Sequence, residues 1–185
     1  MQNTKPYAYL ITYRTYASWL HGDPRHSVHH SNTKPGSLKI PPNEKLQQKM
    51  QSQLSSEEFI LDDKQSEIAL QGIQRACVKY HWRLFAAHVR TNHVHLVVQA
   101  PVDPARVITQ TKAYATRQLR KKQLIQENTR CWSRHGSTRY IWFPEKIFFA
   151  MHYVVERQGE KMACFYEAWF DARIREEIGA VLGEF

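Results

Sequence analysis

The sequence predicts an α+β fold, in which an antiparallel β-sheet has helices packed on one face, a sandwich of the ferredoxin-like sort. The expected elements follow the order strand, helix, strand, strand, helix, strand. The two middle strands are separated only by residues 90–92, which is short enough for a hairpin turn. We therefore expect these two strands to pair antiparallel.

The charge balance points to a polyanionic partner. The 185 residues include 26 Lys and Arg against 17 Asp and Glu, which gives a formal net charge of +9 and a sequence pI of about 9.6. Such a chain attracts polyanions through a long-range positive field, and nucleic acid is the obvious candidate. Aromatic residues make up 12% of the chain and add surfaces on which unpaired bases can stack.

Cysteine usage and hydropathy argue against a disulfide-rich, an exported or a membrane-spanning protein. Cys77, Cys131 and Cys164 are odd in number and far apart, which argues against a disulfide framework and a cysteine-rich zinc site. The N-terminus lacks a cationic region followed by an apolar run, and no stretch of about 18 apolar residues occurs. Export and membrane spanning are therefore not supported, and we expect a cytoplasmic protein.

The length is suited to one domain with a sizeable core. We expect this domain to cover residues 1–160, with a loop and a helix inserted at about 21–62. A helical tail over residues 161–185 is expected to pack on the body. Histidines also occur in the inserted loop, at His26, His29 and His30, but flexible loop histidines are more often solvated than metal-bound.

Aromatic and β-branched residues at 7–15 predict the first strand, placed beside the later His-bearing strand. Asn43 is a candidate N-cap for a helix that runs to about Leu54. A second helix, from about Asp63 to Tyr80, has one apolar face and is expected to cover the sheet. Residues 82–89 then predict the first strand of the hairpin.

The second half of the chain begins with a helix from Asp103, a typical cap residue, to about Ile125. Its outer side is strongly basic and includes Lys112. Residues 131–142 predict a hairpin-like segment with Gly136 at the turn. A further helix lies between Pro144 and Gly159, and its apolar packing stripe leaves Tyr153 outside.

The strongest candidates for functional residues are His93 and His95 on the second hairpin strand. Side chains alternate along a strand, so both imidazoles emerge on one face, while Val94, Leu96 and Val98 point to the other. Two neutral imidazoles side by side can hold one divalent metal ion. The same pattern is also common as solvated polar alternation, and the pair alone does not decide between these interpretations.

Residues 92–98, Asn-His-Val-His-Leu-Val-Val, resemble the His-hydrophobic-His (HUH) signature of the single-tyrosine transposases of the IS200 type and the related REP-associated tyrosine transposases. The resemblance extends from the first strand near Tyr7 to the helix around Tyr153 and is weak in the inserted segment and the tail. It implies an HUH transposase palm, with the histidines on a central strand and a tyrosine supplied by a downstream helix.

By this resemblance, Tyr153 is the nucleophile. Its phenol would attack a DNA phosphorus, form a 5′-phosphotyrosine link and free a 3′-hydroxyl, while a divalent ion, Mg²⁺ or Mn²⁺, polarises the phosphate. A phenolate is a good leaving group, so the link can be reversed, and no nucleotide cofactor is needed. The other interpretation is that Tyr153 is an ordinary helix tyrosine with its hydroxyl in water.

The third metal ligand departs from the family pattern. The family has Gln or Asn four residues after the tyrosine, but this chain has Arg157 there and Gln158 one residue later. On an ideal helix the fifth residue is turned away, whereas a helix end beside Gly159 need not keep ideal angles. We expect Gln158 to join His93 and His95 as a metal ligand, with Glu156 as the alternative and loss of cleavage as a further outcome.

The resemblance also implies single-stranded DNA as substrate, next to a hairpin such as a repetitive extragenic palindrome. The candidates for phosphate contacts and base stacking share basic or aromatic character and are Lys121, Lys122, Arg134, Arg139, Trp132 and Trp142. Monomer and homodimer both stay open, because family members of the two types differ in this respect.

Two rival functions fit the same residues. One is a domesticated protein of the same fold that binds hairpin DNA without cutting it, which the displaced Gln158 favours. The other is a metal-dependent phosphoesterase in which His93 and His95 activate water and Tyr153 is inert. Replacement of Tyr153 by Phe separates the three possibilities.

Overall fold

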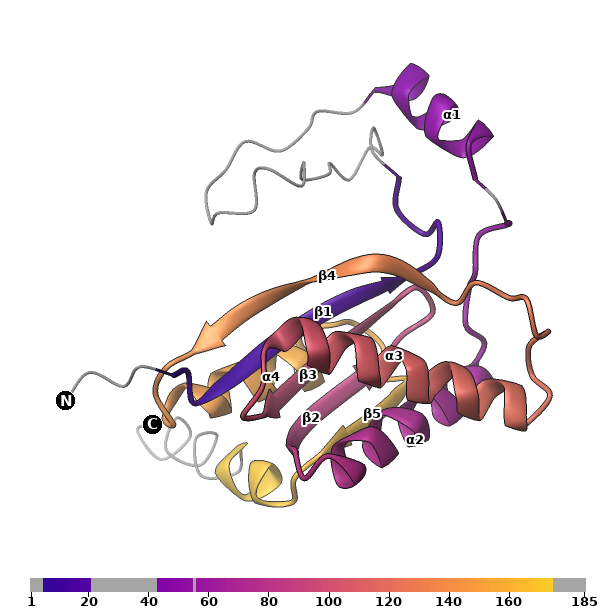
Figure 1. The fold of residues 1–185 in the computed structure, drawn as a ribbon. Helices are drawn as coiled ribbons and strands as arrows, with labels where there is room; N and C mark the ends of the chain where they lie inside the picture. The colour runs from indigo at the N-terminus through magenta and orange to yellow at the C-terminus, as the bar shows by residue number, and fades with distance from the viewer. Residues whose placement is uncertain (1–4, 21–42, 55, 175–185) are drawn as a thin grey trace.

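The computed structural model describes residues 5–20, 43–54 and 56–174. Within them, five strands form one antiparallel sheet in the order β4-β1-β3-β2-β5 (Figure 1). The strands are β1 (Ala8–Thr15), β2 (Arg83–Val89), β3 (His93–Gln99), β4 (Trp132–Ile141) and β5 (Ala163–Tyr166). The predicted α+β class with an antiparallel sheet is thereby confirmed.

Helices cover both faces of this sheet. The long helices α2 (Asp63–Lys79) and α3 (Pro104–Lys121) pack side by side on one face, as expected, whereas α4 (Lys146–Glu156) lies across β2 and β3 on the other (Figure 1). The expectation of helices on one face is therefore wrong for α4, because its strongly apolar stripe needs an apolar surface of its own to cover. Helix α1 (Glu44–Ser52) buries no residue and stands apart from the sheet.

Alternation along the strands divides the interior into two cores. Tyr9, Ile11 and Tyr13 of β1 join the core beneath α2 and α3, together with alternate residues of β3. Ala8 and Val97, on the opposite face, pack against α4. Because side chains of a strand alternate, the residues of β3 that precede Val97 on this face are the two histidines. The register of β3 therefore decides which face the histidines occupy.

Two helix starts follow the predicted capping residues, and a third has a cap that was not predicted. The Asn43 side chain accepts from the Leu46 N–H at 3.0 Å, as predicted for α1. Asp103 accepts from the Ala105 N–H at 2.7 Å at the start of α3. Helix α2 begins with a capping box in which Asp62 and Gln65 exchange side-chain to backbone hydrogen bonds. Local sequence thus sets the beginnings of the helices that flank the hairpin.

The predicted hairpin at residues 131–142 is wrong. Residues 132–141 form the single strand β4, and Gly136 pairs with Tyr13 in the middle of it. A Cβ atom at Gly136 would lie 2.7 Å from the Thr12 carbonyl oxygen, so the glycine permits a close backbone approach rather than a turn. Lys112 of α3, expected on the basic outer side, is buried and donates to the Ser133 and His135 carbonyls.

The C-terminal part also differs from expectation. The helical tail predicted from residue 161 is wrong at its start, because residues 163–166 form β5, which pairs with β2 from Ala86 to Val89. A short helical segment follows at 169–174, and its Phe170 is buried beneath α4. The predicted loop at 21–42, with His26, His29 and His30, lies outside the described residues. No helix within those residues is both long and apolar enough to cross a bilayer.

Gly136 provides a test of the β4 register. Replacement of Gly136 by Ala should lower the free energy of unfolding by about 1–3 kcal/mol, because the new methyl group must push β4 away from the Thr12 carbonyl. Urea denaturation followed by circular dichroism measures the change. Ser137→Ala, at the next residue on the opposite face, is the matched control. Equal stability of the two variants would contradict the described register.

Candidate functional site

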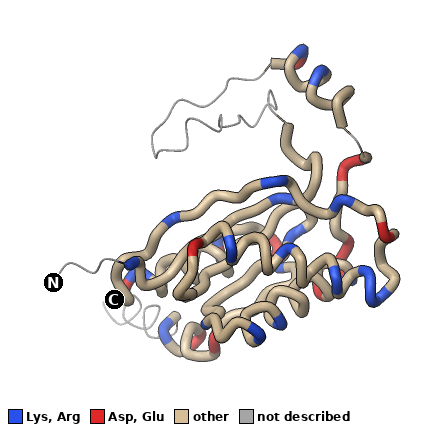
Figure 2. The backbone as a smooth tube through the Cα atoms, viewed as in Figure 1, with Lys and Arg blue, Asp and Glu red and all other residues tan. Residues whose placement is uncertain are grey.

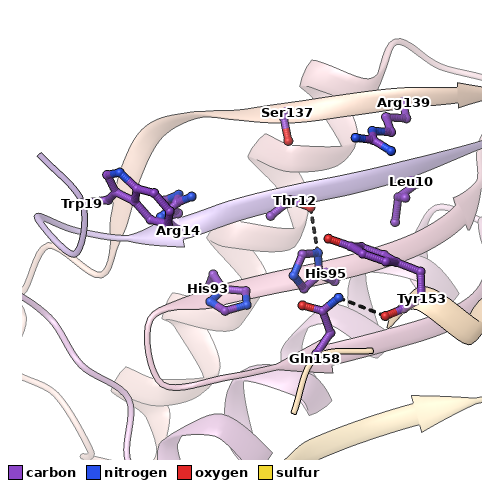
Figure 3. Close-up of a pocket in the computed structure, with 10 residues that line it drawn as sticks. All are labelled: Leu10, Thr12, Arg14, Trp19, His93, His95, Ser137, Arg139, Tyr153 and Gln158. Atoms are coloured by element: carbon purple, nitrogen blue, oxygen red, sulfur yellow. Dashed lines mark hydrogen bonds between the residues drawn. The ribbon is translucent and has the colours of Figure 1, made fainter. Parts of the chain in front are cut away.

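An open cavity of about 320 Å³ lies on the sheet face that carries α4 (Figure 3). Its floor is formed by alternate residues of β1 and β3, one wall by β4, and the other by the C-terminal part of α4 and the residues after it. The lining residues are Leu10, Thr12, Arg14, Trp19, His93, His95, Ser137, Arg139, Tyr153 and Gln158. The cavity therefore brings together segments from both ends of the described chain.

The two histidines stand side by side on the floor of the cavity, with ring centroids 4.8 Å apart. In each ring Nδ1 has a neighbour. His93 Nδ1 lies 2.7 Å from Asn92 Oδ1, and His95 Nδ1 lies 2.7 Å from the Thr12 hydroxyl (Figure 3). An amide oxygen only accepts, so the tautomer that satisfies this contact has the His93 proton on Nδ1 and directs the Nε2 lone pair away from Asn92.

Burial keeps both rings neutral. It lowers the pKa of His93 from 6.5 to about 4, with smaller contributions from the positive charges of Arg90 and Arg14. It also lowers the pKa of His95 to about 3, and the neighbouring His93 and His88 make smaller contributions in the same direction. A hydrogen bond with Gln158 acts in the opposite direction on both. At neutral pH the cavity therefore presents two uncharged imidazoles as electron-pair donors.

Tyr153 lies on the solvent side of α4 and reaches over this pair. Its ring makes an edge-to-face contact with His95, with centroids 5.6 Å apart, and its hydroxyl points into the cavity (Figure 3). The side chain is 44% exposed, while the helix residues beneath it, Met151 and Val154, are fully buried. The predicted packing stripe thus holds the helix down and turns the phenol toward the histidines.

Gln158 also turns toward the histidines. Helix α4 ends at Glu156, so Gln158 lies beyond the last regular turn, and its amide nitrogen donates to the Tyr153 carbonyl at 2.9 Å. Its side chain lines the cavity beside both imidazoles. Arg157 is exposed, and the Glu156 carboxylate pairs with Lys161 at 2.9 Å, so neither lines the cavity.

The donor set fits a divalent metal ion. Each imidazole is neutral and oriented by an Nδ1 neighbour, which is the arrangement that metal-binding histidines require. Among the described residues no group of three His, Cys, Asp or Glu side chains could hold a metal ion. The amide oxygen of Gln158, which lies beside both imidazoles, is the candidate for a third protein ligand at this cavity.

The structure separates the predicted nucleic-acid contacts. Arg139 lines the cavity from β4. Trp142, just after this strand, is 45% exposed and stacks on Tyr140, whose ring packs edge-to-face on Tyr9 of the core beneath α2 and α3. Trp132 also lies toward this core, where it packs edge-to-face on Tyr13 and donates to Thr116. Away from the cavity lie the basic residues Lys121, Lys122 and Arg134. Lys and Arg are spread along the helices and the sheet edge (Figure 2).

Sequence reasoning missed several residues of the cavity, chiefly on β1. Arg14 lies opposite His93 in the strand pairing, and Thr12 lies opposite His95. The Arg14 guanidinium stacks on Trp19, with its carbon 3.2 Å from the ring centroid. The signal was the alternation of Leu10, Thr12 and Arg14 with the apolar Tyr9, Ile11 and Tyr13, which places the first set on the histidine face.

The family of the chain follows from comparison with known proteins. The family model for IS200-like transposases matches residues 45–143, more than half of the sequence, and the chain belongs to this family. The membership gives it a transposase-like role. A solved structure of a REP-associated tyrosine transposase bound to a REP hairpin is similar at 10% identity and a TM-score of 0.44, over 85% of this chain and 69% of that one. No curated protein matches the sequence.

The buried histidines predict a pH-dependent stability in metal-free solution. The pKa values of these histidines in the folded chain, about 4 and 3, lie below the ordinary 6.5. Between these values the unfolded chain therefore binds more protons than the folded chain. The stabilisation is complete above pH 6.5 and is lost as the pH falls toward 4, at up to about 1.4 kcal/mol per pH unit for each group. Urea denaturation in EDTA between pH 5 and 8 measures the slope.

The matched control for the pH series is the double variant His93→Asn and His95→Asn. It keeps the other histidines and should show a shallower fall in the free energy of unfolding between pH 6.5 and 5. The slope, rather than the absolute stability, is compared, because the asparagines also change packing. An unchanged slope would contradict the pKa values assigned to this pair.

Proposed function

We propose that the chain cleaves and rejoins single-stranded DNA next to a hairpin through a covalent link to Tyr153. The observation that supports this most is the convergence of one exposed phenol and two neutral imidazoles on the same cavity within one chain. Membership of the IS200-like transposase family supports DNA as the substrate. The net charge of +9 favours the approach of a polyanion.

The proposed step is a transesterification at phosphorus. The Tyr153 oxygen attacks the scissile phosphate and loses its proton to solvent, and the bond from phosphorus to the 3′-oxygen breaks. The 3′-oxygen takes a proton from solvent and leaves as a hydroxyl, while the 5′-phosphate stays on the tyrosine. One phosphodiester replaces another, so no energy source is consumed and the 3′-hydroxyl of a strand can reverse the step.

His93, His95 and Gln158 would hold the divalent ion that the family resemblance implies. When bound, such an ion polarises the phosphate and disperses its developing negative charge. Two imidazole nitrogens and one amide oxygen suit Mn²⁺ better than Mg²⁺, which prefers an all-oxygen octahedral set. Gln158 stands one residue later than the family's Gln or Asn, which favoured a binder that does not cleave DNA. The glutamine nevertheless lies beside both imidazoles, so this displacement does not remove it from the site.

Two arginines of the cavity are placed to bind the DNA backbone. Arg14 and Arg139 come from neighbouring strands, β1 and β4, and both line the cavity that Tyr153 enters. A guanidinium can donate two parallel hydrogen bonds to phosphate oxygens. Stacking on Trp19 restricts the guanidinium plane of Arg14. We propose that these residues orient the phosphates that flank the scissile one.

The decisive experiment is covalent trapping. The protein is mixed with Mn²⁺ and a 3′-labelled single-stranded oligonucleotide that carries a hairpin, and the products are separated on a denaturing gel. We expect a labelled protein–DNA adduct that disappears when Tyr153 is replaced by Phe. Because Tyr153 is on the helix surface, this variant should keep the stability of the parent chain.

An exposed tyrosine on the opposite face of the sheet provides the control. Tyr140 is 51% exposed but lies outside the cavity, so Tyr140→Phe should form the adduct as the parent does. If Tyr153→Phe still cuts DNA without an adduct, the chain is a metal-dependent phosphoesterase. If the parent binds the hairpin with strong salt dependence but never cuts it, the chain is a binding protein and the proposed reaction is wrong.

A further inference from the structure

The proposed reaction depends on a short segment between α4 and β5 that belongs to no helix or strand. Helix α4 ends at Glu156 and β5 begins at Ala163, so Gln158 lies in the irregular connection between them, residues 157–162. Tyr153 lies in the last full turn before it. Both side chains reach the cavity only if this connection keeps its path over the sheet.

His88 of β2 fixes the two ends of the connection. Its side chain is completely buried, and it lies directly opposite His95 in the pairing of β2 with β3. Nδ1 lies 3.0 Å from the carbonyl oxygen of Val154, the residue after Tyr153, and Nε2 accepts from the Met162 N–H at 3.2 Å. One donor and one acceptor are what a neutral imidazole offers, so the ring bridges the helix end and the start of β5.

Arg90, two residues further along and just beyond the end of β2, fixes the middle of the connection. Its Nη1 atom donates to the Gln158 carbonyl and, at 2.9 Å, to the Glu160 carbonyl. Gly159 between them has a φ angle of +77°, in the left-handed region that favours glycine. The backbone therefore reverses around the guanidinium, and this reversal directs the Gln158 side chain toward His93 and His95.

We propose that His88 and Arg90, named here the β2 pair, are positioning residues for the reaction: they hold the connection so that Tyr153 and Gln158 face the histidines. The inference rests on the proposed function for its chemistry, but its structural part stands alone. Neither member of the pair lines the cavity, so each acts through the residues that it holds. The pair also explains how a glutamine beyond the helix end can still reach the site.

The test uses two readouts on the variant Arg90→Met, which keeps the length of the side chain and removes its donors. Hydrogen exchange followed by mass spectrometry reports the protection of residues 157–162. Titration with Mn²⁺, followed by electron paramagnetic resonance, reports metal affinity without DNA. We expect faster exchange in this segment and a metal Kd weakened by about 10-fold, the usual effect of losing a group that orients a ligand.

Arg83→Met is the matched control, because Arg83 lies at the start of β2, the strand that Arg90 follows, and makes its paired hydrogen bonds with Glu167 instead. It should leave both the exchange of residues 157–162 and the Mn²⁺ affinity unchanged. For His88, the variant His88→Asn retains an amide donor near the Nδ1 position and should restore part of the protection that His88→Ala loses. Adduct formation should follow the same order.

The outcomes separate the two proposals. Unchanged exchange in Arg90→Met and His88→Ala overturns the structural part of the inference. Faster exchange with an unchanged Mn²⁺ affinity and unchanged adduct formation overturns the positioning role. If the parent protein binds no Mn²⁺, the proposed metal site fails, while exchange and adduct formation still decide whether the β2 pair positions the tyrosine.

Discussion

The pairing register of β3 is the constraint on which the site depends. Val94, Leu96 and Val98 are completely buried against the layer of α2 and α3, and this burial forces His93 and His95 onto the opposite face. A shift of one residue would remove these three apolar side chains from the core beneath α2 and α3 and bury the imidazoles there instead. At about 1.5–3 kcal/mol for each large aliphatic side chain, such a shift is strongly disfavoured. The hydrophobic core thus fixes the position of the polar chemistry.

The second requirement is the placement of α4 on that face. Its apolar stripe completes a separate core with Phe85 and Val97, so the helix is held by burial rather than by polar contacts at its outer side. The helix brings the phenol of Tyr153 to the edge of the cavity. The connection after the helix is held differently, by hydrogen bonds from His88 and Arg90 to backbone atoms. Burial holds the body of the helix that carries the nucleophile, and polar contacts hold the end of that helix and the glutamine beyond it.

Local and periodic signals make much of the fold predictable. The capping residues and the alternation around the histidines are short-range features, and the corresponding helices and strands lie within a few residues of their expected bounds. The errors concern pairing over long distances. Gly136 resembles a turn residue because only the partner strand reveals the close approach to Thr12. Residues 163–166 join the sheet through β2, far earlier in the chain, and no local pattern encodes that pairing. Arg14 enters the site for the same reason, through its position opposite His93.

The distance between the Tyr153 ring and a metal ion held by the histidines is the most direct test of a shared site. 3-Fluorotyrosine incorporated at position 153 gives one fluorine resonance, and Mn²⁺ broadens such a resonance steeply with proximity. Titration with Mn²⁺ should broaden the signal strongly in the parent protein, and the broadening should be lost in a variant with His93→Ala and His95→Ala. A resonance that stays sharp while Mn²⁺ saturates the histidines would show that the phenol and the imidazoles do not share one site.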